Sequence, residues 1–207
     1  MTQGGTGQNG GMTLELDQKA VLLRYLQSAR GALVWKLEGL SDYDVRRPLV
    51  PSGTNLLGLV KHVASVEAGY FGAIFGRPFP DPMPWYDDGA EPNEDMWATA
   101  DQSREWVIDL YKRVWAHADA TIEALDLDSP GFVPWWSEGK QEVTLHTMLV
   151  HMIAEANRHC GHADILREQL DGSVGQRAGS DNMGEGDAAA YAAHVARLQA
   201  TAEQFRD

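Results

Sequence analysis

The chain has 207 residues, of which 43% are hydrophobic, and its 30 acidic and 17 basic residues give a net charge of -13. The hydrophobic content is sufficient for the core of one ordinary domain. The negative charge argues against binding to nucleic acid or to an anionic membrane surface. No apolar run approaches the roughly 20 residues that span a bilayer, and residues 1–12 lack the apolar centre of a secretory signal. We therefore expect a cytoplasmic protein with a disordered tail over residues 1–12 and a single domain over residues 13–207.

Two features of the composition bear on redox chemistry. The single cysteine, Cys160, excludes an internal disulfide and a multi-cysteine zinc site, and we expect it to be a small buried thiol. The chain also has 12 Arg against 5 Lys, together with 25 Ala. This bias is typical of a GC-rich genome of the actinobacterial type, which bears on the small thiols that the host cell contains.

The pattern of apolar residues is helical almost throughout. Three segments rich in proline, glycine or tryptophan, at 39–54, 76–98 and 129–137, read as loops, and no run alternates like a strand. The spacing predicts four long helices and a further one at the C-terminus: 17–38, 54–75, 99–125, 143–170 and 187–205. We therefore expect an all-α fold, a four-helix bundle of the antiparallel type with long loops, and the C-terminal helix packed alongside it.

The helix predicted at 143–170 carries titratable groups within its apolar stripe. At about 100° per residue, with His151 at zero, His162 falls near 20°, Glu155 near 40° and His159 near 80°. Apolar residues such as Met148 and Leu166 occupy the same side of this helix. A buried carboxylate is costly unless it is paired or bound to a metal. A metal is the simplest compensation for a glutamate that is flanked by imidazoles.

A catalytic site of the zinc type needs three protein ligands and one open position. Glu155 and His159 lie one turn apart on one face of their helix, and His62 edges the apolar stripe of the helix predicted at 54–75. Sites of this kind are built in bundle cores from facing helices. We expect these three residues to hold a divalent metal, zinc in the first place, with nickel and iron(II) as alternatives.

A family resemblance rests on the segment 55–67, NLLGLVKHVASVE, on the Pro134-Trp-Trp motif and on residues 144–168. In these segments the chain resembles the DinB-like four-helix metalloenzymes, and in particular the branch related to mycothiol-dependent maleylpyruvate isomerase. The resemblance implies a metal held by His62, Glu155 and His159. Many relatives have histidine in place of Glu155, and a His-Glu-His set resembles the zinc site of that isomerase. We do not expect the isomerase's separate C-terminal domain here, so its substrate is not carried over.

These observations favour a metal-dependent S-transferase that activates a low-molecular-weight thiol, by the resemblance mycothiol, for attack on an electrophilic small molecule. A thiol that binds the metal loses its proton because the thiolate is the true ligand. A metal-dependent hydrolase or isomerase, in which the metal activates water, is one alternative. A non-catalytic metal- or thiol-binding stress protein is another, and a closed fourth ligand would favour it. The sequence also leaves open whether the protein forms a homodimer.

Five more residues are candidates for the site. His151 and His162 flank the proposed ligands and could orient them or transfer a proton, although a packing role explains them as well. Arg158 could meet an acidic group of the substrate or form an ordinary surface ion pair. Trp135 and Trp136 could wall the mouth of the pocket or cap the bundle end. The loops 76–98 and 129–137 are the expected selectors of substrate.

Overall fold

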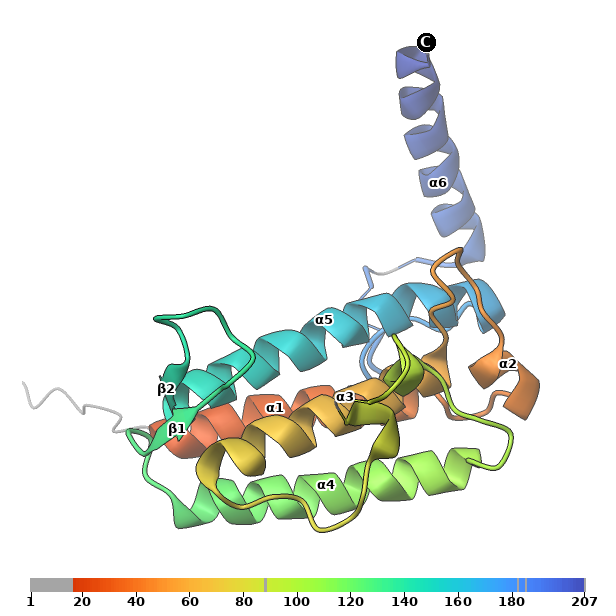
Figure 1. Ribbon diagram of the computed structural model, residues 1–207. Coiled ribbons are helices and arrows are strands. Elements are labelled where there is room, and N and C mark those ends of the chain that lie inside the picture. Colours follow the sequence, from red (N-terminus) through yellow and green to blue (C-terminus); the bar gives the residue numbers. More distant parts are fainter. Residues whose placement is uncertain (1–16, 88, 182, 185, 207) are drawn as a thin grey trace, which may run out of the picture.

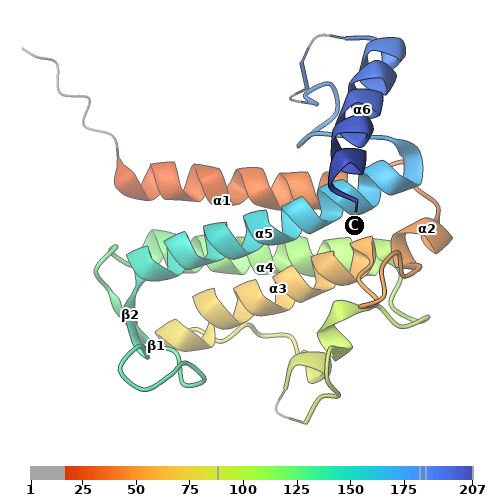
Figure 2. The same cartoon turned by 90° about the horizontal axis from the view of Figure 1, so that it is seen from above.

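The computed structural model describes residues 17–87, 89–181, 183–184 and 186–206, and the expected N-terminal tail lies outside them. Four long α-helices form the bundle (Figures 1 and 2). Short helices, one hairpin and a C-terminal helix complete the order α1 (Gln18–Trp35), α2 (Asp42–Arg46), α3 (Leu56–Phe71), η1 (Ala73–Phe75), η2 (Pro84–Tyr86), η3 (Glu94–Met96), α4 (Arg104–Ala124), β1 (Pro130–Phe132), β2 (Glu142–Thr144), α5 (Leu145–Asp171), α6 (Ala188–Ala202) and η4 (Glu203–Phe205). The all-α prediction is confirmed.

The four bundle helices begin where a polar side chain can accept a hydrogen bond from the first turn. Asp17, Asn55, Ser103 and Thr144 cap α1, α3, α4 and α5 in this way, and such caps each contribute about 1 kcal/mol. Helix α5 ends at Gly172, whose positive φ of 77° suits a glycine. Two of the predicted helices were several residues too long at one end. Helix α4 begins at Arg104 and not at residue 99, and α3 ends at Phe71 and not at residue 75.

The direction of α4 differs from the expected antiparallel arrangement. The side chain of Arg77, just after α3, donates a hydrogen bond to Thr121 near the end of α4. The ends of α3 and α4 therefore lie together, and the two helices run in the same direction, as the colours in Figures 1 and 2 show. The segment between them, residues 72–103, must return along the length of the bundle. The parallel direction of α3 and α4 is possible because a long crossover connection allows neighbouring helices to run in the same direction.

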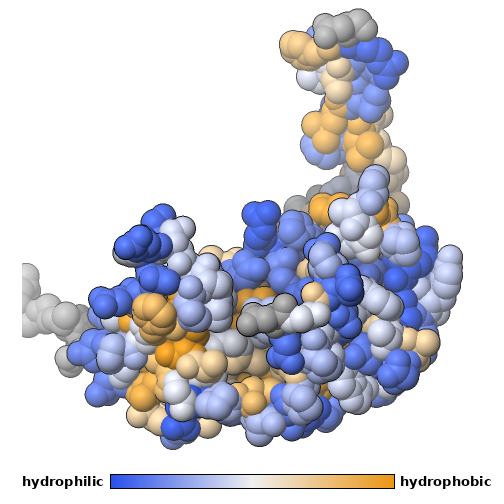
Figure 3. All heavy atoms as spheres, viewed as in Figure 1, coloured by the Kyte–Doolittle hydropathy of each residue, from blue (hydrophilic) through white to orange (hydrophobic). Residues whose placement is uncertain are grey.

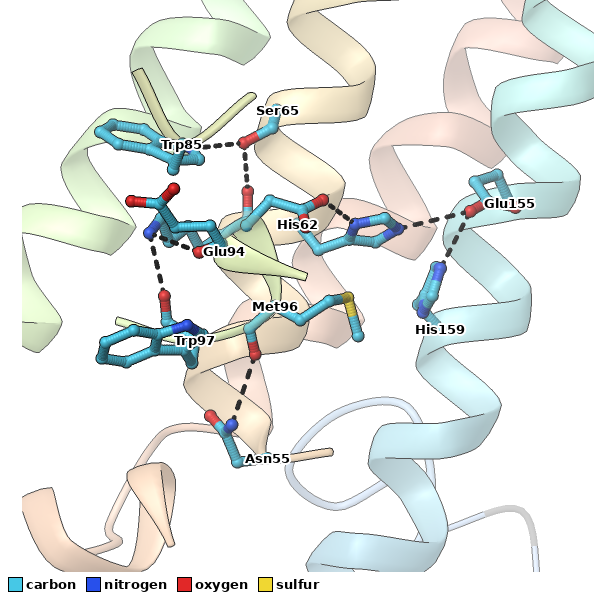
Figure 4. Close-up of polar contacts among 11 residues, drawn as sticks. Asn55, His62, Ser65, Trp85, Glu94, Met96, Trp97, Glu155 and His159 are labelled. Atoms are coloured by element: carbon cyan, nitrogen blue, oxygen red, sulfur yellow. Dashed lines mark hydrogen bonds and ion pairs between the residues drawn. The ribbon is translucent and has the colours of Figure 1, made fainter. Parts of the chain in front are cut away.

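This crossover segment is fixed to α3 by contacts at successive turns. A Cβ atom at Gly58 would lie 1.8 Å from the carbonyl oxygen of Met96, so only glycine permits this approach. The buried Lys61 donates hydrogen bonds to the carbonyl oxygens of Glu94 and Trp97. These contacts hold η3 against the N-terminal half of α3, where His62 lies (Figure 4).

Two predicted loops contain regular structure. The segment 39–54 includes the short helix α2, which Ser41 caps. The segment after α4 forms a two-stranded antiparallel hairpin in which Gly131 pairs with Val143. Strands of three residues are too short to show an alternating pattern, so the expectation of no strand was wrong for this hairpin. It closes one end of the bundle and carries Trp135 and Trp136 in its loop.

Helix α6 does not pack alongside the bundle, which corrects the prediction for the C-terminal helix. It projects from the end of α5 (Figure 1), and none of its residues is buried. Apolar side chains are exposed along it, as Figure 3 shows, including Val195 at 60% and Leu198 at 56% exposure. The apolar spacing that predicted this helix is real, but it does not specify a partner surface. Among the described residues, no helix is long and apolar enough to cross a membrane.

Candidate metal centre

Three side chains from two helices meet where α3 faces α5. His62 of α3 and Glu155 and His159 of α5 each offer a ligand atom, and these atoms all lie within 4.8 Å of one another. Glu155 Oε1 is 2.9 Å from His159 Nε2 and 3.7 Å from His62 Nε2 (Figure 4). The sequence prediction that these three residues converge is therefore confirmed as geometry.

The orientation of His62 is set by a carboxylate from the crossover segment. Its Nδ1 lies 2.6 Å from Asp95 Oδ2 in η3, so this nitrogen carries the proton and donates to the carboxylate. The other nitrogen, Nε2, is then left with a free lone pair that faces Glu155. A carboxylate behind a histidine is the usual device that orients a metal ligand and increases its basicity. Burial opposes ionisation of Asp95, but its contacts with His62 outweigh burial and hold its pKa below the usual value.

Burial and charge keep the other two groups in the protonation states that metal binding requires. Burial and the proximity of His62 lower the pKa of His159 despite its bond to Glu155, which favours a neutral imidazole. Burial opposes ionisation of Glu155 as well, but the hydrogen bond with His159 and the nearby imidazoles lower its pKa overall. A neutral imidazole at His159 and an ionised carboxylate at Glu155 are the forms in which these side chains bind a metal.

The donor set fits a small divalent ion. Imidazole nitrogen and carboxylate oxygen bind zinc at about 2.0–2.2 Å, so ligand atoms across one ion are separated by about 4 Å or less. The separations of Glu155 from His159, 2.9 Å, and from His62, 3.7 Å, fall within that limit, and all three ligand atoms lie within 4.8 Å of one another. Nδ1 of His159 is buried without a hydrogen-bond partner among the described residues, which leaves one polar atom at the centre unsatisfied. Within the same described ranges no fourth histidine, cysteine or carboxylate joins the three.

A second polar cluster lies one turn from Glu155 toward the hairpin. His151 Nε2 is 3.2 Å from the hydroxyl of Tyr70, and Trp136 Nε1 donates to the same oxygen at 3.3 Å. The rings of Trp136 and His151 are packed edge to face at 5.0 Å. Trp135 is 54% exposed and lies against Tyr70, with ring centroids 5.9 Å apart. The hairpin loop therefore lies against Tyr70 and His151, one turn from Glu155, and the role of Trp135 and Trp136 as a pocket wall stays a prediction.

The remaining candidates lie at the surface. His162 is exposed, contrary to the expectation that it lies on the buried face of its helix. Its ring still contacts the ring of His159, with a distance of 5.4 Å between the centroids. Arg158 is exposed on α5, and its contact with a substrate stays a prediction. The thiol of Cys160 points away from the centre and donates a hydrogen bond to the carbonyl oxygen of Ala29 in α1. Burial raises the pKa of this thiol to about 12. The prediction of a buried thiol is confirmed.

Sequence reasoning missed Asp95 and Tyr86. Both lie in the crossover segment, whose proline content predicted a functional loop but not which side chain reaches the centre. Burial, with Tyr70, Asp95 and Glu155 nearby, raises the pKa of Tyr86 to about 12, so its hydroxyl remains a hydrogen-bond donor. The spacing along the chain contains no signal for these contacts, because they depend on how the segment crosses the bundle.

The comparison with protein families decides the class of protein. The model of the mycothiol-S-transferase family matches residues 21–172, which is well over half of the chain. The chain belongs to the mycothiol-S-transferase family. The matched residues include most of α1 and all of α2 to α5, and hence every residue of the proposed centre. The family is one of transferases. No curated protein matches the chain.

Proposed function

We propose that this member of the mycothiol-S-transferase family is a divalent-metal-dependent enzyme that transfers a thiol, mycothiol, to an electrophilic small molecule. The observation that carries the proposal is the convergence of His62, Glu155 and His159 around one point, with no fourth protein ligand among the described residues. Structural sites saturate their metal with protein ligands, whereas catalytic sites keep a position open. The GC-rich signature of the composition is consistent with mycothiol as the thiol.

In this proposal, His62, Glu155 and His159 hold the ion, and Asp95 keeps the Nε2 lone pair of His62 directed toward it. The bound ion supplies Lewis acidity that lowers the pKa of a thiol. Two imidazoles and one carboxylate leave a divalent site with a net charge near +1, which favours an anionic sulfur. Zinc suits this donor set best, with nickel and iron(II) as alternatives.

The reaction then needs a proton acceptor and a positioned co-substrate. The thiol proton passes to His162, which is exposed beside His159 and can release it to water. The sulfur forms a bond to the electrophilic carbon, and the leaving group departs with the electron pair of the bond that breaks. Tyr70, held by His151 and Trp136, and the protonated Tyr86 offer hydroxyl groups to the polar parts of the thiol.

The test is a transfer assay with mycothiol and monobromobimane on protein loaded with zinc, nickel or iron(II). We expect a rate well above that of metal-free protein, loss of this rate in His159→Ala, and its retention in His146→Ala. His146 is an exposed histidine on the same helix and serves as the matched control. A wild-type rate equal to that of the metal-free protein would exclude the proposal.

A further inference from the structure

A cavity lies beside the metal centre, between α5 and the loop that joins α2 to α3. It has a volume of about 380 Å³. Small-molecule sites in proteins usually enclose about 300–1,000 Å³, so this groove suits a compact ligand or part of one. It is lined by Val50, Ser52, Thr54, Gly161, His162, Ile165 and Leu166.

The chemistry of the lining is apolar and uncharged apart from one imidazole. None of the lining residues is a lysine, arginine, aspartate or glutamate. A charged ligand would lose hydration here without gaining an ionic partner, which is unfavourable. An apolar group gains about 25 cal/mol for each Å² that it removes from water. The lining therefore selects a neutral, apolar group.

The position of the groove ties it to the reaction centre. His162 lines the groove, and its ring also contacts His159, a proposed metal ligand, at a centroid distance of 5.4 Å. Ile165 and Leu166 follow one turn later on α5, and one helical turn is about 5.4 Å long. A molecule whose apolar part lies on these residues can place a reactive carbon next to the metal centre.

The glycine that lines this groove, Gly161, has no packing explanation. Gly161 lies in the interior of α5, where glycine costs about 1 kcal/mol relative to alanine. A Cβ atom at this position would meet nothing within 4 Å, so no neighbouring backbone or side chain requires the glycine. Gly161 lines the groove, so a larger side chain at this position would occupy part of its volume.

We propose that this groove binds the apolar body of the electrophilic co-substrate and so determines which electrophiles the enzyme accepts. The inference rests on the proposed function for the reaction itself, while the binding of an apolar molecule can be measured separately. It names the substrate class as neutral electrophiles with an aromatic or aliphatic body. The polar body of the thiol, as distinct from its reacting sulfur, is left to the opposite side of the centre, where the hydroxyl groups of Tyr70 and Tyr86 lie.

The first experiment measures binding without catalysis. The neutral fluorescent probe N-phenyl-1-naphthylamine is titrated into metal-loaded wild type, Gly161→Leu and Gly31→Leu. Gly31 is an exposed helical glycine on α1 with equally open space at its Cβ, which makes it the matched control. We expect saturable binding to wild type, at least about tenfold weaker binding to Gly161→Leu, and an unchanged affinity in the control. Equal affinity in all three proteins would overturn the proposal.

The second experiment uses two electrophiles with the same reactive group, iodoacetamide and N-phenyl iodoacetamide. In Gly161→Leu the KM for the phenyl compound should rise about tenfold, and that for iodoacetamide should stay within about twofold. Ile165→Gln, at an exposed wall of the groove, should give the same pattern if the leucine variant does not fold. Equal effects on both compounds would contradict the assignment. A change of oligomeric state in Gly161→Leu with unaltered probe binding would assign the groove to a second copy of the chain instead.

A wild type that transfers mycothiol to none of the three electrophiles, monobromobimane included, would refute the proposed function, and the probe titration would then decide the groove alone.

Discussion

At the scale of single residues, the centre depends on a division of roles among carboxylates. Glu155 lies between two imidazoles and can bind a metal directly, whereas Asp95 contacts only the far nitrogen of His62. Asp95 thereby fixes which nitrogen of His62 carries the proton. A ligand whose orientation is fixed in advance loses less conformational entropy when the metal binds. The strength of metal binding should therefore depend on a residue that does not touch the metal.

This dependence gives a direct prediction for Asp95→Asn. We expect the affinity for zinc to fall about 10- to 100-fold, because the amide holds His62 less firmly and does not increase its basicity. Competition with a chromophoric chelator measures the change. Asp87→Asn, at an exposed position of the same segment, should leave the affinity unchanged. An unaltered affinity in Asp95→Asn would show that the contact with His62 has no role in metal binding.

At the scale of elements, an ion pair in the core joins three of the four bundle helices. Arg30 of α1 is 1% exposed and contacts both the fully buried Glu67 of α3, at 2.5 Å, and Asp119 of α4, at 2.7 Å. Burial raises the pKa of Glu67, and the guanidinium of Arg30 opposes this effect. A buried pair of this kind contributes little net stability, but the loss of one partner leaves an uncompensated charge. It therefore favours one relative arrangement of α1, α3 and α4.

For this pair, Arg30→Met should lower the free energy of unfolding by about 3–5 kcal/mol. The double variant Arg30→Met/Glu67→Leu should recover most of that loss, because neither charge is then left alone in the core. Urea denaturation of the two variants and of Glu67→Leu gives the coupling energy. If the two single losses simply added in the double variant, the pair would not be coupled.

The arrangement of the elements also explains which features could be predicted from the sequence. The long helices and the inward positions of Glu155 and His159 follow from periodicity, which is a local property. The pairing with His62 needed only that two apolar stripes face each other. The contribution of Asp95 and the parallel direction of α4 depend on the path of residues 72–103, which is a long-range property. Exposure of His162 was missed because an angle on a helix does not say where the neighbouring helices end.

At the scale of the whole molecule, the bundle and α6 are distinct in their packing. The family model ends at residue 172, and no residue of α6 is buried. The preceding segment does contact the bundle, since Lys36 donates to the carbonyl oxygen of Gly175. The free energy that stabilises the bundle should therefore come almost entirely from residues before α6.

Removal of residues 187–207 tests this division. Because the deleted helix buries nothing against the bundle, we expect Tm to change by no more than about 2 °C, with metal affinity unchanged. Differential scanning calorimetry at several protein concentrations measures this. A large, concentration-dependent fall in Tm would show instead that α6 stabilises an oligomer.

The central claim is that a thiol enters the open position of a metal held by His62, Glu155 and His159. It is tested most directly by the absorption spectrum of the cobalt(II)-substituted protein as mycothiol is added. The account predicts a new sulfur-to-cobalt charge-transfer band that saturates at one thiol per site. The same molecule without its thiol should give no band. Saturating mycothiol that leaves the cobalt spectrum unchanged would contradict the account.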